Sequence, residues 1–322
     1  MGQDAKPIVV VSKCLGFAAC RYNGLTIPSE VVDRLAPFVR FLPVCPEVEI
    51  GLGVPRAPIR VVERANERRL LQPTTGLDVT EKMLSFATAF LNSLDEVHGF
   101  VLKGRSPSCG IKDVRIFSSA DNPMPVGKGS GFFGAAVLAR FGFLPGEDEG
   151  RLSNFRLREH FLTHLFATAR FQQVKARGQM GALVEFHSRQ KLLLMGYSQK
   201  HLWEMGRLVA NRDKRPLAVL LAEYERLLHG AFARPARKPS MVNVLMHALG
   251  YFSPQLGAKE KAFFLDTLTQ FRQGQAPLSV PIAVIKAWIA RFGQPYLESQ
   301  FFFNPYPEAL VGISDSGKGR DW

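Results

Sequence analysis

Short apolar runs alternate with helix-like segments through the first half of the chain. Strand-like runs, rich in β-branched residues, occupy residues 7–14, 40–47, 60–65 and 98–110. Apolar residues recur every three or four positions, as in amphipathic helices, in residues 29–39, 80–94 and 130–143. Strands separated by helices of this length predict an α/β domain with a largely parallel sheet.

The second half of the chain has a different pattern, made of long amphipathic segments. Its helix-like segments are residues 154–178, 183–197, 198–210, 216–233, 240–252 and 258–274. Ser198, Ser240 and Gly257 are suited to helix boundaries. The polar, acidic stretch 144–154 is typical of a linker. We therefore predict a mainly α-helical second domain and place the domains at residues 1–147 and 148–322.

Composition is that of an ordinary globular protein. Of the 322 residues, 46% are hydrophobic and 21% are charged. No apolar run approaches the roughly 18 residues that a membrane span needs, and no apolar leader with a cleavage site is visible. We expect a cytoplasmic protein that does not contact a membrane. The sequence gives no indication of its oligomeric state.

The net charge of +13 is concentrated in the second half. Residues 1–150 hold 17 Lys and Arg against 16 Asp and Glu, whereas residues 151–322 hold 24 against 12. A basic excess confined to one domain favours an anionic partner there, with nucleic acid first among the candidates. The alternative is a solvated cationic surface that binds nothing specific.

Three of the four cysteines share a position relative to the predicted strands. Cys14, Cys45 and Cys109 each follow a strand and lie among loop residues. In open α/β sheets, ligands bind outside the carboxyl ends of the strands, so these thiols could meet at one sheet edge. A core-filling role is the alternative for each of them. Cys20, beside Arg21, has no assigned role.

Five motifs, in order, resemble the thiouracil desulfurase family. They are SKCLGFAACRYNG (12–24), VCPEVEIGLGVPRAP (44–58), GLDVT (76–80), LKGRSPSCG (102–110) and GKGSGFFGAA (127–136). The resemblance covers about residues 7–145. The helical half resembles the YbgA-like domain that is often fused behind such a domain, mainly by position and character.

The resemblance implies a 4Fe-4S cluster held by Cys14, Cys45 and Cys109, with one iron left open. Thiolates are the usual ligands of such clusters. It also implies removal of sulfur from a thiolated pyrimidine to leave a carbonyl. A soft thiocarbonyl sulfur matches an open, Lewis-acidic iron, and water then replaces sulfide without net redox change.

The same motifs supply candidate catalytic residues. Glu47, two residues after Cys45, is a candidate general acid or base, and the alternative is a surface or capping carboxylate. Ser106 and Ser108 flank Pro107, and we expect one of them to be catalytic without choosing between them. Their alternative role is to cap the turn.

Residues in two loops are candidates for substrate binding: Arg21, Tyr22, Asn23, Lys103 and Arg105. A structural salt bridge is an alternative for Arg21, and Lys103 and Arg105 could orient a phosphate or simply solvate the loop. Asn23 and Arg60 stand where the family commonly has acidic residues, which leaves the role of Asn23 open. In the glycine-rich motif, close packing of Gly131 or Gly134 at a helix start is favoured over a phosphate-binding loop.

Basic turns with nearby aromatic residues suggest RNA binding by the helical half. The turns are residues 175–178, 211–216 and 233–239, and the aromatic residues are Tyr197, Trp203, Tyr251 and Phe252. Aromatic residues at helical spacing are also typical of a core. We predict that this domain binds transfer RNA or another thiolated RNA and delivers its 4-thiouridine to the cluster.

Three functions are therefore compatible with the sequence. The first is a cluster-dependent desulfurase that converts 4-thiouridine in tRNA to uridine and releases sulfide. The second keeps this chemistry but restricts the substrate to free thiouracil or other small thiolated bases. The third is an iron–sulfur redox sensor that binds nucleic acid.

Overall fold

The protein folds into two compact units. The computed structural model describes residues 6–64, 67–120 and 124–312. The first unit holds the described residues up to Ala169 and from Ala309 onward, and the second is Arg170–Glu308. The first unit thus extends past the predicted boundary at residue 147, through the first part of α5 (Phe155–Arg177).

A parallel sheet forms one layer of the first unit. It contains β1 (Ile8–Ser12), β2 (Arg40–Val44), β6 (Gly99–Leu102) and β9 (Gly146–Asp148) in the order β2-β1-β6-β9. All three pairings are parallel. Every residue of β1 and β6 is buried, which explains their continuous apolar runs. The predicted parallel sheet is confirmed.

A second, mixed sheet lies in the same unit. Its strands are β3 (Arg60–Arg64), β4 (Glu67–Gln72), β5 (Leu77–Asp78), β7 (Val114–Phe117) and β8 (Pro125–Gly129). Their order is β5-β4-β3-β7-β8, and only the β3–β7 pairing is parallel. The hydrophobic pattern predicted β3 alone, because the other strands are short or largely polar.

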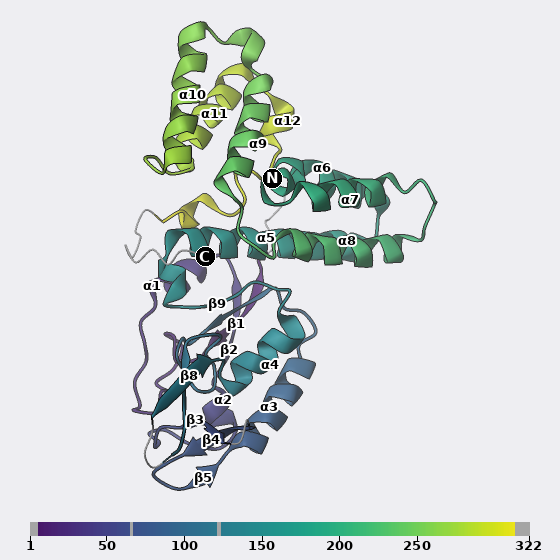
Figure 1. Ribbon diagram of the computed structural model, residues 1–322. Coiled ribbons are helices and arrows are strands. Elements are labelled where there is room, and N and C mark those ends of the chain that lie inside the picture. The colour runs from purple at the N-terminus through teal and green to yellow at the C-terminus, as the bar shows by residue number, and fades with distance from the viewer. Residues whose placement is uncertain (1–5, 65–66, 121–123, 313–322) are drawn as a thin grey trace. The chain divides into compact units, whose positions relative to one another are not determined.

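Four helices complete this unit: α1 (Glu30–Leu35), α2 (Pro46–Glu49), α3 (Thr80–Asn92) and α4 (Phe132–Phe141). Helices α3 and α4 lie side by side (Figure 1). Met83 and Phe133 from these helices are fully buried together with Phe100 of β6 in one apolar core. This core supports the strands whose carboxyl ends carry the cysteines.

The stretch predicted as a linker, 144–154, is largely structured. It contains β9 at the edge of the parallel sheet and a 3-10 turn at Arg151–Ser153. Its acidic residues are internal acceptors: Glu149 accepts the backbone N–H of Gly104 at 2.7 Å, and Asp148 accepts that of Arg151 at 2.8 Å. Polar composition misled the prediction because these carboxylates bind the backbone instead of water.

The second unit is helical, as predicted. It contains the end of α5, followed by α6 (Met180–Tyr197), α7 (Gln199–Ala210), α8 (Leu217–Ala231), α9 (Lys238–Gly250), α10 (Ala258–Gln273), α11 (Ser279–Phe292) and α12 (Pro295–Glu298). Ser198 and Gly257 are N-caps of α7 and α10, as expected. Ser240 is not a boundary, because α9 begins at Lys238. No helix among the described residues has the length and hydropathy to cross a membrane.

Candidate active site

Three cysteines meet at the carboxyl edge of the parallel sheet. Cys14 follows β1, Cys45 follows β2 as the N-cap of α2, and Cys109 lies in the turn after β6. These strands are neighbours in the sheet. All three residues line one cavity of about 450 Å³, called the cysteine cavity below. Cys109 is buried and also contacts the apolar core, so it lies where the cavity meets the core.

Cys45 and Cys109 are buried and Cys14 is half-buried, and the Cys14 thiol interacts electrostatically with the other two. Burial, assisted by the nearby Cys45, raises the pKa of Cys14 to about 11. Burial also raises the pKa of Cys109, against the opposing hydrogen bond from Ser12. These thiols are therefore protonated near neutral pH, and metal binding there must displace their protons.

The donor set fits a cluster better than a single ion. Within the described ranges, no three His, Cys, Asp or Glu side chains lie close enough together to hold one metal ion. A 4Fe-4S cubane is larger than one ion and takes thiolate ligands, so its ligands surround a cavity. The cysteine cavity offers three thiols in that arrangement.

Two glycines at the start of α4, the N-cap Gly131 and Gly134, hold the turn that carries Cys109. The backbone N–H groups of Gly131 and Gly134 donate to the carbonyls of Gly110 (2.8 Å) and Ser108 (3.0 Å). A Cβ on Gly131 would lie 2.5 Å from the Ser108 oxygen, and one on Gly134 would lie 2.3 Å from the Gly110 oxygen. Contacts this short are not tolerated, so close packing explains these glycines, as the sequence analysis favoured.

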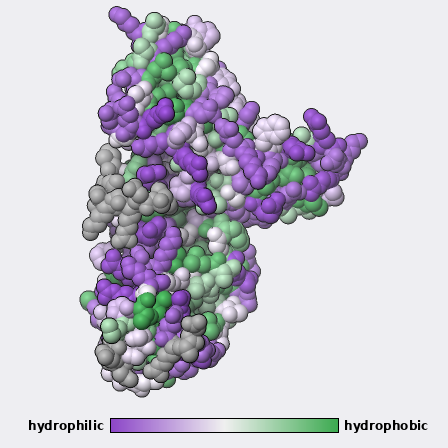
Figure 2. All heavy atoms as spheres, viewed as in Figure 1, coloured by the Kyte–Doolittle hydropathy of each residue, from purple (hydrophilic) through white to green (hydrophobic). Residues whose placement is uncertain are grey.

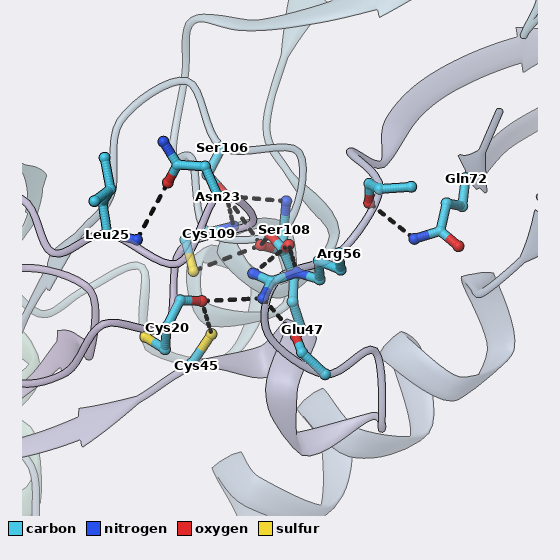
Figure 3. Close-up of polar contacts among 12 residues, drawn as sticks. Cys20, Asn23, Leu25, Cys45, Glu47, Arg56, Gln72, Ser106, Ser108 and Cys109 are labelled. Atoms are coloured by element: carbon cyan, nitrogen blue, oxygen red, sulfur yellow. Dashed lines mark hydrogen bonds and ion pairs between the residues drawn. The ribbon is translucent and has the colours of Figure 1, made fainter. Parts of the chain in front are cut away.

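Glu47 and the two serines form a continuous hydrogen-bonded chain (Figure 3). The Ser108 hydroxyl donates to Oε1 of Glu47 at 2.6 Å, and the hydroxyls of Ser106 and Ser108 are 2.9 Å apart. The Ser106 oxygen also accepts the backbone N–H of Cys109 at 3.1 Å. Ser108 is buried, whereas Ser106 is only partly buried. This series of hydrogen bonds thus runs from the Glu47 carboxylate to the more accessible hydroxyl of Ser106.

Arg56 holds the other oxygen of that carboxylate, a role that the sequence analysis missed. Its Nε and Nη2 both lie 2.8 Å from Oε2 of Glu47. Nη1 donates to the carbonyls of Cys20 (3.0 Å) and Gly53 (2.9 Å). The side chains of Arg56 and Glu47 are 4% and 12% exposed, so this is a buried charge pair. Arg56 lies nine residues after Glu47 within the motif 44–58, and this position was the sequence feature that could have indicated its role.

Cys20 also lines the cysteine cavity, although the sequence gave it no role. Burial and the adjacent Cys45 raise the pKa of Cys20 to about 12. The Cys45 thiol donates to the carbonyl oxygen of Cys20 at 3.8 Å. Its short distance in sequence from Cys14 was the signal that could have placed it at the site.

Four of the five candidate substrate-binding residues line the cysteine cavity: Arg21, Tyr22, Lys103 and Arg105. The Arg21 guanidinium lies 5.2 Å from the centre of the Tyr22 ring. Lys103 is already paired with Glu149. Asn23 is not among the lining residues and instead accepts the backbone N–H of Leu25 at 3.3 Å.

Comparisons with known protein families match two separate parts of the chain. A family model described as 2-thiouracil desulfurase matches residues 9–149. A second model, described as a protein of unknown function (DUF1722), matches residues 191–307.

Two curated relatives match different parts of the chain. The uncharacterized protein YbgA of Escherichia coli (strain K12) is 29% identical over 164 residues, which are 50% of this chain and 96% of YbgA. The uncharacterized protein YbbK of Bacillus subtilis (strain 168) is 34% identical over 110 residues, which are 32% of this chain and 73% of YbbK. Among solved structures, the 4Fe-4S-dependent thiouracil desulfidase TudS is 32% identical, with 46% of this chain and 93% of that chain covered and a TM-score of 0.35.

Proposed function

Because the chain belongs to the 2-thiouracil desulfurase family through residues 9–149, we propose that it desulfurates thiolated uracil with a 4Fe-4S cluster, acting on 4-thiouridine in tRNA. Water replaces the sulfur: the C=S group and H₂O become C=O and H₂S, and no electrons are exchanged. The observation that carries this proposal is one cavity lined by Cys14, Cys45 and Cys109, together with Cys20, and by the hydrogen-bonded residues Glu47, Ser108 and Ser106.

Cys14, Cys45 and Cys109 would hold the cluster and leave one iron without a protein ligand. When bound, the cluster supplies a Lewis acid whose softness matches a thiocarbonyl sulfur. Burial favours the neutral thiols of Cys14 and Cys109, so the protein gives up their protons when it takes up the cluster.

The chain's own residues provide proton transfer. Arg56 binds Oε2 of Glu47, which leaves Oε1 to accept the Ser108 hydroxyl. Ser106 accepts the proton of the attacking water, passes its own proton to Ser108, and Glu47 receives the proton of Ser108. Reversal of the same relay returns this proton to the departing sulfide, and the second proton of H₂S comes from the hydroxyl that becomes the carbonyl oxygen. Both serines thus act, Ser106 at the reacting atoms and Ser108 as the link to Glu47.

The pyrimidine ring would be held by the first loop. Tyr22 is 40% exposed beside Arg21, so its ring offers a stacking surface at the mouth of the cysteine cavity. The Arg21 guanidinium can donate to the uracil carbonyl that remains.

Helix α7 of the second unit presents a surface suited to RNA. Trp203 is 76% exposed, and Lys200 and Arg207 lie three residues before and four after it, on the same helix face. The α7–α8 connection, residues 211–216, continues this surface with exposed Arg212 and Lys214, and hydrophilic side chains cover it in Figure 2. An exposed aromatic ring among cations can stack on a base while the cations contact phosphates.

Other residues of the predicted RNA surface have internal roles. Phe252 is fully buried, with ring centroids 5.9 Å from those of Trp288 and Phe292, so it belongs to the core. Lys175 and Arg215 are paired with Glu225 and Glu223, at 2.8 and 2.6 Å. The proposal therefore rests on the face of α7 and on the connection after it.

Sulfide release under anaerobic conditions tests the proposed function. We expect protein purified without oxygen to contain about four iron and four sulfide per chain. It should release sulfide from tRNA that contains 4-thiouridine and leave uridine in its place. Cys14→Ser, Cys45→Ser and Cys109→Ser should each lose iron and activity.

Comparison of the RNA with free thiouracil separates the alternatives. Activity on the free base alone would restrict the substrate to small thiolated bases. A cluster-containing protein that releases sulfide from neither compound would contradict the proposal and favour the redox sensor.

A further inference from the structure

Ser12 lines the cysteine cavity but takes no part in the proton relay proposed above. It is the last residue of β1, two residues before Cys14, and it is 1% exposed. It shares the lining of the cavity with the three cysteines. A hydroxyl with so little access to solvent needs protein partners for its proton and its lone pairs.

One partner of the Ser12 hydroxyl is the main chain of the neighbouring strand. The Ser12 oxygen accepts the backbone N–H of Lys103 at 2.8 Å. Lys103 directly follows β6, which pairs in parallel with β1. This bond occupies a lone pair of the oxygen and fixes the position of the side chain. The hydroxyl proton therefore remains for another acceptor.

The second partner is the Cys109 side chain, which is hydrogen-bonded to Ser12. Cys109 is also buried, so the two groups meet away from solvent. Once Cys109 has given up its proton to bind iron, only Ser12 can donate in this bond. A hydroxyl that donates to a thiolate forms a charge-assisted hydrogen bond, which is roughly twice as strong as a neutral one.

Ser108 cannot supply the same bond to the sulfur. Its hydroxyl is 3.7 Å from the Cys109 sulfur but 2.6 Å from Oε1 of Glu47 (Figure 3). A hydroxyl has a single proton, and the shorter contact with the carboxylate takes it. Ser12 is thus the hydroxyl that remains for the Cys109 sulfur.

The contact at Cys45 is of the opposite kind. The Cys45 thiol donates to the carbonyl oxygen of Cys20 at 3.8 Å. A thiolate has no proton to donate, so Cys45 loses this bond when it binds iron, whereas the bond from Ser12 to Cys109 becomes stronger. Of these two ligands, Cys109 is therefore the one that keeps a hydrogen-bond donor.

We propose that Ser12 is a positioning residue for the cluster: its hydroxyl, oriented by the backbone N–H of Lys103, donates to the Cys109 thiolate. Such a bond stabilises negative charge on the sulfur, so it raises the reduction potential of the cluster. A contact of this kind behind a metal ligand also strengthens retention of the metal. The inference rests on the proposed function, because it requires the cluster, but it does not depend on which thiolated substrate is used.

The reduction potential and iron retention of the full chain, purified without oxygen, test the proposal. In Ser12→Ala, we expect the reduction potential to become more negative and iron to pass to a chelator about 10- to 100-fold more readily. Ser12→Thr keeps a hydroxyl at this position and should return both values toward those of the wild type. The measurements are potentiometric titration followed by electron paramagnetic resonance, and competition with the chelator.

Thr80 supplies a matched control in the same unit. Its hydroxyl is also buried, 3% exposed, and accepts the backbone N–H of Leu70 at 2.8 Å. Thr80 is not among the residues that line the cysteine cavity. Thr80→Val and Ser12→Ala each leave a backbone N–H without this acceptor, so both should lower the melting temperature. Only Ser12→Ala should change the potential and the retention of iron.

Three results would overturn the proposal. The first is a Ser12→Ala protein with the potential and iron retention of the wild type. The second is an equal loss of iron from Ser12→Ala and Thr80→Val, since it would indicate a general loss of stability. If Ser12→Ala takes up no cluster, Ser12→Thr decides: a potential near that of the wild type supports the proposal, and an equal failure to take up the cluster is the third contrary result.

Failure of the proposed function gives a different result. A wild-type protein that contains no iron–sulfur cluster under anaerobic conditions would contradict the proposed function and this inference together. A cluster that responds to Ser12→Ala as expected, in a protein that releases no sulfide from thiolated substrates, would contradict the proposed function alone, because the potential and the retention of iron are measured without turnover.

Discussion

Arg56 determines which oxygen of Glu47 is left to accept the Ser108 hydroxyl. Its guanidinium binds Oε2 through two nitrogens, which leaves Oε1 to the Ser108 hydroxyl. The same guanidinium binds the carbonyl of Cys20, so one residue fixes both the carboxylate and the loop next to Cys45. A lysine could supply the charge but not this fork of donors.

We expect Arg56→Ala to lower kcat about 10- to 100-fold and to reduce the free energy of unfolding by about 3–5 kcal/mol, because it leaves a buried carboxylate unpaired. Arg56→Lys should recover stability more fully than kcat. The measurements are steady-state sulfide release, chemical denaturation and iron content.

The exposed pair of Arg68 and Glu63 provides the control for this change. Arg68→Ala should cost less than about 1 kcal/mol and leave kcat unchanged. An Arg56→Ala protein with unaltered kcat would exclude a positioning role for Arg56.

At the scale of elements, the start of α4 shapes the site although none of its side chains enters it. Its first backbone N–H groups bind the carbonyls of the turn that carries Ser106, Ser108 and Cys109. The turn therefore keeps its shape through main-chain contacts, and these require glycine at the points of closest approach.

Gly134→Ala tests this packing, because alanine would ordinarily favour a helix by about 1 kcal/mol over glycine. Here the added Cβ would lie 2.3 Å from the Gly110 oxygen. We therefore expect alanine to destabilise the protein, lowering the free energy of unfolding by about 1–3 kcal/mol, and to weaken its retention of iron. Thermal unfolding and iron content are the measurements. Gly127→Ala, whose Cβ has open space, should leave both nearly unchanged.

At the scale of the whole molecule, the basic residues are concentrated in the second half of the chain. Residues 1–150 hold 17 basic and 16 acidic residues, whereas residues 151–322 hold 24 basic and 12 acidic residues. An anionic macromolecule would be attracted mainly by the second half, in a manner that depends on salt.

Trp203→Ala should raise the Kd for tRNA about 5- to 100-fold, because a stacking surface is lost. The salt dependence of binding should stay the same, since no charge is removed. Filter binding at several salt concentrations measures both. Phe263→Ala, which removes another exposed ring of the same unit, from α10, should bind tRNA as the wild type does. Equal behaviour of the two variants would exclude the α7 face as the RNA surface.

The sequence by itself determined the elements whose pattern is local. Apolar periodicity identified the helices from α5 to α10 and the buried strands β1 and β6, and the five ordered motifs identified the family that residues 9–149 match. It also placed three cysteines after strands, and parallel strands end at a common edge, so their convergence could be predicted.

Only the tertiary structure decided which polar residues act together. β8 is almost wholly exposed, and the sequence of β9 is polar like that of a linker. Both segments are strands because they pair with neighbouring strands, and their local hydrophobic pattern does not indicate this. Arg56 forms an ion pair with Glu47, nine residues earlier in the chain, and Arg115 of β7 lies opposite Lys128 on the adjacent strand β8. Such contacts depend on how the folded backbone brings charged side chains together in space. The spacing of these residues along the chain does not reveal the distance between them in the fold.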